Sequence, residues 1–138
     1  AMRRRFRLLR CLAWLAAGPA LAQDVVVFAH EGMPKSDAAT LQRLYTGRAV
    51  SINQRAARPL HLVAGHPVRR EFLDKVLAQD EGQYTGYWLV RRYVGKGAPP
   101  LEFAELDELI RFVAATPGAV GYAPAAKLPP GSNIIFRP

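Results

Sequence analysis

An apolar run with no polar interruption, residues 25–29 (VVVFA), is the feature that most limits how this chain can fold. Four of its five residues are β-branched or aromatic, which is typical of a strand. Polar and apolar residues do not alternate here, so both faces of the strand must be covered, as in a parallel sheet packed between helices. The run therefore predicts a buried strand near the start of a layered domain.

The rest of the chain switches between strand and helix patterns. Turn residues such as Gly47, Gly65 and the pair Pro117 and Gly118 separate the segments. Residues 48–58 are polar and are predicted to be irregular. The order strand, helix, strand, three helices, strand, strand favours an α/β fold with a mostly parallel or mixed central sheet flanked by helices. The predicted helices cover about 37–46, 67–77, 82–94 and 104–115, and the later strands 60–64, 119–122 and 134–136.

Local signals support the predicted helices. Ser36 is a good N-cap for the first, and Pro67 suits the first position of the second. The last helix has one apolar face, because its large apolar residues recur three, four and seven positions apart. The third is dense in aromatic residues, for which we expect core packing, and it ends in a solvated basic pair, Arg91 and Arg92. The apolar face of the last helix consists of Leu106, Leu109, Ile110 and Val113. The aromatic residues of the third helix are Tyr84, Tyr87, Trp88 and Tyr93.

The first 22 residues have the three parts of a secretory signal. Five arginines precede the apolar run 11–17, and Ala20, Leu21 and Ala22 place small residues where a signal peptidase reads. The apolar run is much shorter than the roughly 20 residues that cross a bilayer, so no permanent membrane span is expected. We predict a cleaved signal peptide at 1–22 and one periplasmic or otherwise extracytoplasmic domain at 23–138. The general secretory route is preferred, although the start also resembles a twin-arginine signal.

Removing that segment changes what the composition implies. The full chain has 19 basic and 11 acidic residues; five basic residues lie in the segment, which leaves 14 against 11. Basic residues of the remaining chain are interspersed with Glu and Asp, which does not favour nucleic-acid binding. The one cysteine, Cys11, also lies in the segment, so the predicted domain has no disulfide, catalytic thiolate or thiolate metal site.

Four stretches, in this order, resemble the phosphate-type periplasmic solute-binding proteins, above all their short single-lobe relatives. They are residues 41–48 (LQRLYTGR), 67–73 (PVRREFL), 87–100 (YW followed by GKGAPP) and 117–122 (PGAVGY). The resemblance implies a single-lobe sandwich of the periplasmic-binding-protein kind. It also implies capture or sensing of phosphate or another oxyanion, as an accessory to ABC transport or signalling.

The resemblance also implies where a ligand would bind. Two-lobed members hold an oxyanion with hydroxyls, an arginine and backbone N–H groups at helix starts, which present unpaired donors. The corresponding turn here is 65–70, and the candidate ligand residues are His66, Val68, Arg69, Arg70 and Ser36. The family's Ser-Gly-Thr aligns with residues 66–68, so two hydroxyls and the N–H of Pro67 are missing. The family's first lobe also has no counterpart.

The residues leave several interpretations open. One lobe can bind an anion weakly, bind a second copy that completes the cleft, or act as an adaptor for an envelope transporter or sensor protein. Arg69 can instead pair with Glu71 or Asp74 on its own helix. His30, His61 and His66 lack a metal-ligand spacing, and His61 is expected to point outward, so we predict no metal. No cofactor and no enzymatic activity are expected, because no nucleophile elbow, paired-carboxylate pattern or phosphate-binding glycine loop occurs.

Overall fold

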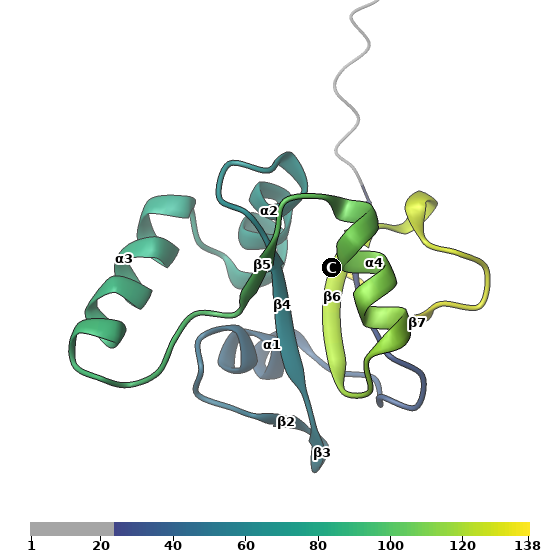
Figure 1. Ribbon diagram of the computed structural model, residues 1–138, viewed down its shortest axis with the longest axis horizontal. Helices are drawn as coiled ribbons and strands as arrows, with labels where there is room; N and C mark the ends of the chain where they lie inside the picture. Colours follow the sequence, from purple (N-terminus) through teal and green to yellow (C-terminus); the bar gives the residue numbers. More distant parts are fainter. Residues whose placement is uncertain (1–23) are drawn as a thin grey trace, which may run out of the picture.

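The computed structural model describes residues 24–138, so the predicted signal peptide lies outside the described residues. At its centre is a five-stranded sheet, with a helix or helices against each face (Figure 1). No helix in this part of the chain is long and apolar enough to cross a membrane. In spatial order the strands are β5 (Leu101–Phe103), β4 (Arg58–Leu62), β6 (Ala119–Pro124), β1 (Val25–Ala29) and β7 (Asn133–Phe136).

The sheet is mixed, which confirms the predicted fold class. Strand β4 runs parallel to β5 and β6, whereas β1 is antiparallel to both β6 and β7. All five residues of β1 are buried, as the sequence predicted. The continuous apolar run thus correctly predicts that β1 is buried on both faces. It does not predict whether the neighbouring strands run parallel or antiparallel to β1.

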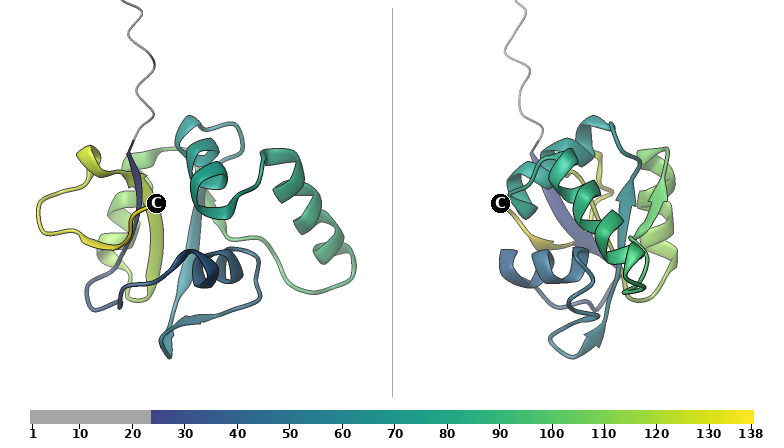
Figure 2. Two further views of the ribbon diagram at one scale, coloured as in Figure 1. Left: turned by 180° about the vertical axis from the view of Figure 1, so that it is seen from behind. Right: turned by 90° about the vertical axis from the view of Figure 1, so that its left-hand side faces the viewer.

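The neighbouring residues Gly121 and Tyr122 show how both faces are covered. A Cβ atom on Gly121 would lie 2.7 Å from Leu109 of α4 (Leu106–Ala115), so α4 packs closely on that face. The ring of Tyr122 stacks on Phe72 of α2 (Pro67–Phe72), with 3.9 Å between ring centroids. Because successive side chains of a strand point to opposite faces, α4 and α2 lie on opposite sides of the sheet (Figure 2).

The helices lie close to their predicted positions. Helix α1 spans Ala38–Tyr45 and α3 spans Glu81–Tyr93, while α2 continues into a π-helical turn, η1 (Leu73–Leu77). The N-cap of α1 is Asp37 and not Ser36, because an Asp37 carboxylate oxygen accepts from the Thr40 N–H at 2.7 Å. The backbone N–H of Ser36 instead donates to Ile135 in β7.

Three short strands were not predicted. Residues 48–58, expected to be irregular, contain a small hairpin of β2 (Ser51–Ile52) and β3 (Arg55–Ala56). Asn53 and Gln54 have positive φ angles of 44° and 68°, as a two-residue hairpin turn requires. Ile52 is the buried anchor of this hairpin. The other unpredicted strand is β5, and a 3-10 turn, η2 (Ala125–Lys127), was also not predicted. Both follow segments that contain proline, and their sequences have no apolar periodicity that indicates a strand or a helix.

One hydrophobic core holds these elements together. Its members come from both sides of the sheet, and all of them lie between Val25 and Ile135. The predicted apolar face of α4 is confirmed for Leu109, Ile110 and Val113, whereas Leu106 is only partly buried. One core thus joins the described elements on both faces of the sheet.

Candidate functional site

The carboxyl ends of β4, β5 and β6 lie at one edge of the sheet, and the chain leaves them in different directions. After β4 it passes through α2 and α3 to β5 on one side, whereas after β6 it passes through η2 to β7 on the other. In open α/β sheets, ligands bind outside the carboxyl ends of strands at such a topological switch point. We call this place, with the turn 63–66 and the start of α2, the switch edge.

The start of α2 has few free donors. His66 is the N-cap, and its Nδ1 accepts a hydrogen bond from the Val68 N–H at 3.1 Å. Pro67 has no N–H, and the Arg70 N–H donates to the His66 carbonyl oxygen. His66, Val68 and Arg70, three of the predicted ligand residues, therefore bond to one another within the first turn of α2: the backbone N–H groups of Val68 and Arg70 both donate to His66. The side chain of Val68 is buried.

Arg69 is the most constrained residue of the switch edge. Only 3% of it is exposed, and each of its three guanidinium nitrogens lies within 3.2 Å of a carboxylate oxygen. Nε and Nη2 lie against the two oxygens of Glu81 in α3, and Nη1 donates to Glu102 in β5 and to the carbonyl oxygen of Leu62. Burial opposes the charged form, but the hydrogen bond and negative charge of Glu81 outweigh it, so the pKa of Arg69 is raised.

These partners differ from the ones considered in the sequence. The expected ion pairs with Glu71 or Asp74 on the same helix do not form, because Arg69 points inward between α3 and β5. Nothing in the sequence near Glu81 or Glu102 indicated that they would contact Arg69. These contacts form only because α3 and β5 pack around the end of β4. The other two candidates are separate: Arg70 is exposed, and Ser36 lies beside β7, away from the turn 63–66.

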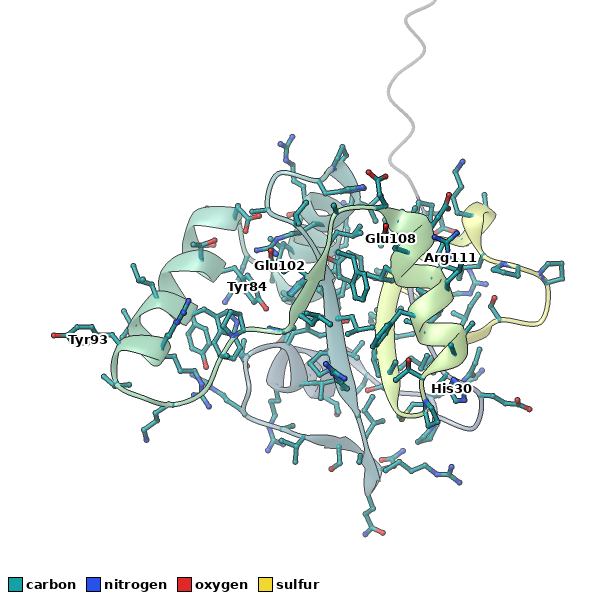
Figure 3. The ribbon with its side chains drawn as sticks, in the orientation of Figure 1. His30, Tyr84, Tyr93, Glu102, Glu108 and Arg111 are labelled. Atoms are coloured by element: carbon teal, nitrogen blue, oxygen red, sulfur yellow. The ribbon has the colours of Figure 1, made fainter. Side chains whose placement is uncertain are left out.

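The switch edge is rich in carboxylates. Glu81 and Glu102 remain 37% and 41% exposed in their side chains although both contact Arg69. The chain then passes from β5 into the exposed residues Glu105, Asp107 and Glu108 at the start of α4 (Figure 3). Glu81 and Glu102 carry one negative charge more than Arg69 neutralises, so this cluster opposes an incoming oxyanion, and the exposed Arg70 is the one further arginine at the start of α2.

His61 precedes Leu62, whose carbonyl oxygen binds Arg69, and it is buried, so the prediction that it points outward is wrong. Both faces of β4 are covered, and the ring nitrogens find partners inside the core. The Leu62 N–H donates to the Tyr122 hydroxyl oxygen, and the same hydroxyl lies 2.7 Å from His61 Nδ1, to which it donates when the proton of the neutral ring is on Nε2. On the other side His61 Nε2–H donates to the Tyr84 hydroxyl, which in turn donates to the Tyr45 carbonyl oxygen.

The titratable groups of this network keep their neutral forms. Burial lowers the pKa of His61 well below its ordinary value, and the positive charge of Arg69 lowers it further. Burial also raises the pKa of Tyr45, Tyr84 and Tyr122. Neutral His61 and the protonated Tyr122 and Tyr84 form a chain of hydrogen bonds from the Leu62 N–H to the Tyr45 carbonyl oxygen. This chain connects β4, β6, α1 and α3.

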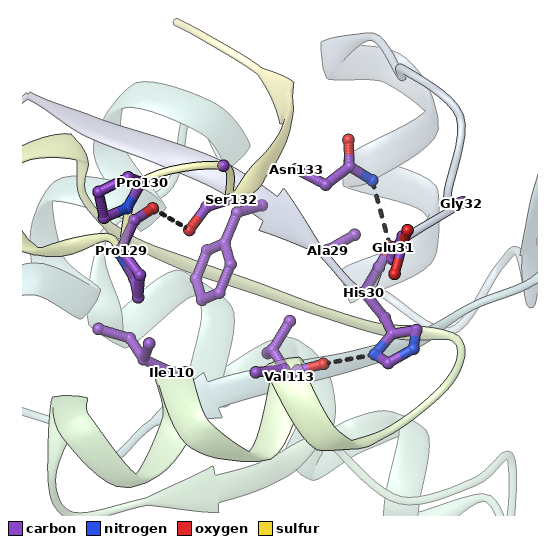
Figure 4. Close-up of a pocket in the computed structure, with 13 residues that line it drawn as sticks. Ala29, His30, Glu31, Gly32, Ile110, Val113, Pro129, Pro130, Ser132 and Asn133 are labelled. Carbon is purple, nitrogen blue, oxygen red and sulfur yellow. Dashed lines mark hydrogen bonds between the residues drawn. The ribbon is translucent and has the colours of Figure 1, made fainter.

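The three histidines do not come together. Because β1 runs opposite to β4, His30 after β1 lies at the edge of the sheet opposite the switch edge. There it lines an open hollow of about 630 Å³, and its Nδ1 donates to the Val113 carbonyl oxygen (Figure 4). Within residues 24–138 no three side chains of His, Cys, Asp or Glu are placed to hold a metal ion.

No family model matches the chain, and no curated protein matches it with significance. Among solved structures, it is similar to an ABC-type phosphate transport receptor from Vibrio cholerae, with a TM-score of 0.60 and 11% sequence identity. The match covers 81% of this chain and 45% of the receptor, so the chain spans less than half of that protein. This protein therefore has a periplasmic-binding-protein-like α/β fold. At this identity the likeness concerns the fold, and the family itself is not shown.

Proposed function

We propose that this protein is a non-enzymatic, extracytoplasmic adaptor that uses a periplasmic-binding-protein-like domain to bind another envelope protein and no longer captures an oxyanion. The observation that carries this proposal is the position of Arg69, whose guanidinium group is neutralised by Glu81 and Glu102. The fold likeness to a transport receptor supports a binding role. The predicted cleavage of residues 1–22 is the reason for the extracytoplasmic location.

The charge balance argues against oxyanion capture at the switch edge. A phosphate ion that bound Arg69 would have to displace a carboxylate that holds the guanidinium group in a two-point contact. The ion would also lie near the uncompensated negative charges of α4. The start of α2 offers little in return, because Pro67 has no N–H and the Val68 N–H is bonded to His66.

Oxyanion capture or sensing, as an accessory to an ABC transporter, is the second candidate. The fold likeness to a phosphate transport receptor favours it. It requires Glu81 and Glu102 to move away from Arg69 when the anion binds, or a second copy of the chain to supply donors across the switch edge. His66, Val68, Arg69 and Arg70 would then be the contacting residues, as the resemblance implies.

Calorimetry with phosphate and sulfate separates the two candidates. The adaptor proposal predicts no binding heat at millimolar anion for the wild-type protein. The double variant Glu81→Gln/Glu102→Gln should gain weak anion binding, because it frees the Arg69 fork. Glu105→Gln/Glu108→Gln, which removes the same charge without touching Arg69, should not. Wild-type binding that Arg69→Lys abolishes would show that the protein captures the anion.

Site-specific crosslinking tests the partner. A photo-reactive amino acid replacing Ala64, which is exposed in the turn after β4, should capture a defined protein in native envelopes. The same residue replacing Ala114, exposed near the hollow at the opposite edge, is the matched control. Equal products at both positions, or none at Ala64, would contradict docking through the switch edge.

A further inference from the structure

Helix α3 has an inner face that fixes it to the end of α1. Tyr84 and Trp88 are buried, and both donate to the carbonyl oxygen of Tyr45. Tyr87 donates to the Thr46 carbonyl oxygen at 2.7 Å, and Arg91 donates to that of Gly47 at 3.0 Å. Four donors on one side of α3 thus satisfy three consecutive carbonyls at the end of α1, which lack partners within their own helix.

The outer face of α3 has no such partner and is apolar. Leu89, Val90, Tyr93 and Val94 are 69%, 65%, 92% and 59% exposed. Their spacing places them in one stripe along the helix, because residues four apart lie above one another. Helix α3 lies at one end of the molecule, and Tyr93 points outward from it (Figures 1 and 3).

A shallow groove lies beside the inner face of α3. It has a volume of about 390 Å³, reaches α3 at Trp88, and is lined by Val50, Pro99, Pro100 and Leu101 among others. Val50 and Leu101 are themselves exposed. In residues 24–138, every large hydrophobic side chain that is strongly exposed therefore lies on the outer face of α3 or on this groove.

The C-terminal part of α3 and the loop after it are basic. Glu81 begins the helix, but residues 82–101 and the facing residues 38–58 contain no Asp or Glu, and Arg92 and Lys96 lie at the end of the helix and in the loop. Arg48 lies over the ring of Tyr87, 5.7 Å from its centroid, and Arg43 lines a hollow with the same tyrosine. The N-terminal end of α3 thus contributes Glu81 to the switch edge, whereas its C-terminal end lies among basic residues.

We propose that this basic and apolar surface, formed by Leu89, Val90, Tyr93, Val94, Arg92 and Lys96, binds an anionic lipid surface. The aliphatic and tyrosine side chains would enter the outer part of the lipid layer, and the cations would contact its phosphate groups. This inference goes beyond the adaptor function and involves a different part of the molecule.

The charge and shape of the surface favour lipid over other occupants. A second copy that used the same surface would place basic residues against basic residues. A single helical stripe is small for a stable protein interface, which buries about 800 Å² on each partner. A lipid surface offers a continuous anionic layer above an apolar interior, and it accommodates protruding side chains such as Tyr93 without a matching pocket.

Vesicle co-sedimentation tests the proposal on the predicted mature protein, which begins at Gln23. We expect binding to vesicles of about 30% phosphatidylglycerol in phosphatidylcholine, and little binding to pure phosphatidylcholine. Val90→Gln/Tyr93→Gln should weaken binding about tenfold or more by removing the apolar contacts. Arg92→Gln/Lys96→Gln should do the same by removing charge, and raising NaCl from about 0.05 to 0.5 M should weaken the wild-type interaction.

The matched control is Arg111→Gln/Lys127→Gln, which removes two positive charges from exposed positions outside α3. Arg111 lies on the other side of the molecule from Tyr93 (Figure 3). This variant should change vesicle affinity less than about twofold. The proposal would be overturned if the wild-type protein did not bind anionic vesicles at low salt. It would also be overturned if the control variant lost as much vesicle affinity as Arg92→Gln/Lys96→Gln. Binding to polyglutamate without binding to vesicles would assign the surface to an acidic protein instead.

Discussion

The ring of His61 is held in one protonation state by the groups on either side of it. Tyr84 accepts from Nε2–H because its own proton goes to the Tyr45 carbonyl oxygen, and Nδ1 of the neutral ring then accepts from the Tyr122 hydroxyl. A second proton, on Nδ1, would replace the hydrogen bond that Tyr122 donates, and its charge would be buried and repelled by Arg69. The neutral Nε2–H form is therefore part of the folded structure.

Stability should consequently depend on pH through His61. The unfolded chain binds a proton at His61 below pH 6.5, its ordinary pKa, whereas the folded chain does not because burial lowers that pKa. The stabilisation is complete above pH 6.5 and is lost as the pH falls towards the folded pKa. Urea unfolding should show a loss of about 1.4 kcal/mol between pH 7.5 and 5.5 from this residue.

His61→Gln is the comparison variant, and it should be less stable overall but should lack this dependence. The pKa of the Asp37 carboxyl is lowered from 3.8 by its hydrogen bonds with Thr40, so it titrates below this pH range. Nitrogen NMR should find the Nε2–H tautomer at both pH values. Equal pH dependence in wild type and variant would contradict the assignment.

Among the elements, α3 depends on side-chain hydrogen bonds to α1 at the place where α1 ends. Gly47 has a positive φ of 72°, and a Cβ atom there would lie 2.8 Å from the Trp88 ring. Gly47 therefore ends α1, and its lack of a side chain lets the Trp88 ring of α3 pack against it. The sequence predicted the helix stop from Gly47, but the approach of Trp88 has no local signal.

Two tyrosines of α3 form a matched pair for testing this attachment. Tyr87→Phe removes the hydrogen bond to the Thr46 carbonyl oxygen and should lower the free energy of unfolding by about 0.5–1.5 kcal/mol. Tyr93→Phe removes a hydroxyl from a side chain that is 92% exposed and should change it by less than about 0.5 kcal/mol. Chemical denaturation measures both values; equal effects would mean that the Tyr87 bond does not hold α3.

Helix α4 provides the test of core packing. Leu109 is fully buried against Gly121 of β6, so Leu109→Ala should lower the free energy of unfolding by about 2–5 kcal/mol. Arg111→Ala, on the exposed side of the same helix, is the control and should cost less than about 0.5 kcal/mol. A loss below that value for Leu109→Ala would mean that the face of α4 is misplaced.

These elements show what a single sequence can predict. The four main helices and β1 follow from apolar spacing, caps and turn residues, all of which act within a few positions. The hairpin at Ser51–Ala56 was missed because Ile52 is its one buried large apolar residue, so no period could be read. Ser36 was assigned as the cap of α1 because Ser and Asp are similarly good caps, and tertiary contact with β7 decided between them.

At the scale of the whole molecule, the fold brings together groups that lie far apart in the chain. The sequence placed Arg69 correctly at the start of a helix after β4, but Glu81 and Glu102 reach it from α3 and β5. The same assembly gathers Glu81, Glu102 and the acidic start of α4 at the switch edge and leaves the C-terminal end of α3 among basic residues. Neither feature follows from local spacing, because both depend on the positions of whole elements.

The attachment of α3 also decides whether the molecule unfolds in one step. Helix α3 lies at one end, yet Tyr84 connects it to His61 in the core and Glu81 connects it to Arg69. In protein beginning at Gln23, Trp88 is the single tryptophan and is buried between α3 and the rest of the domain. Its fluorescence therefore reports the detachment of α3, while far-ultraviolet circular dichroism reports all the helices. We expect the two urea transitions to coincide. A fluorescence transition at lower urea would show that α3 detaches first, and that the contacts of Tyr84 and Glu81 do not couple it to the core.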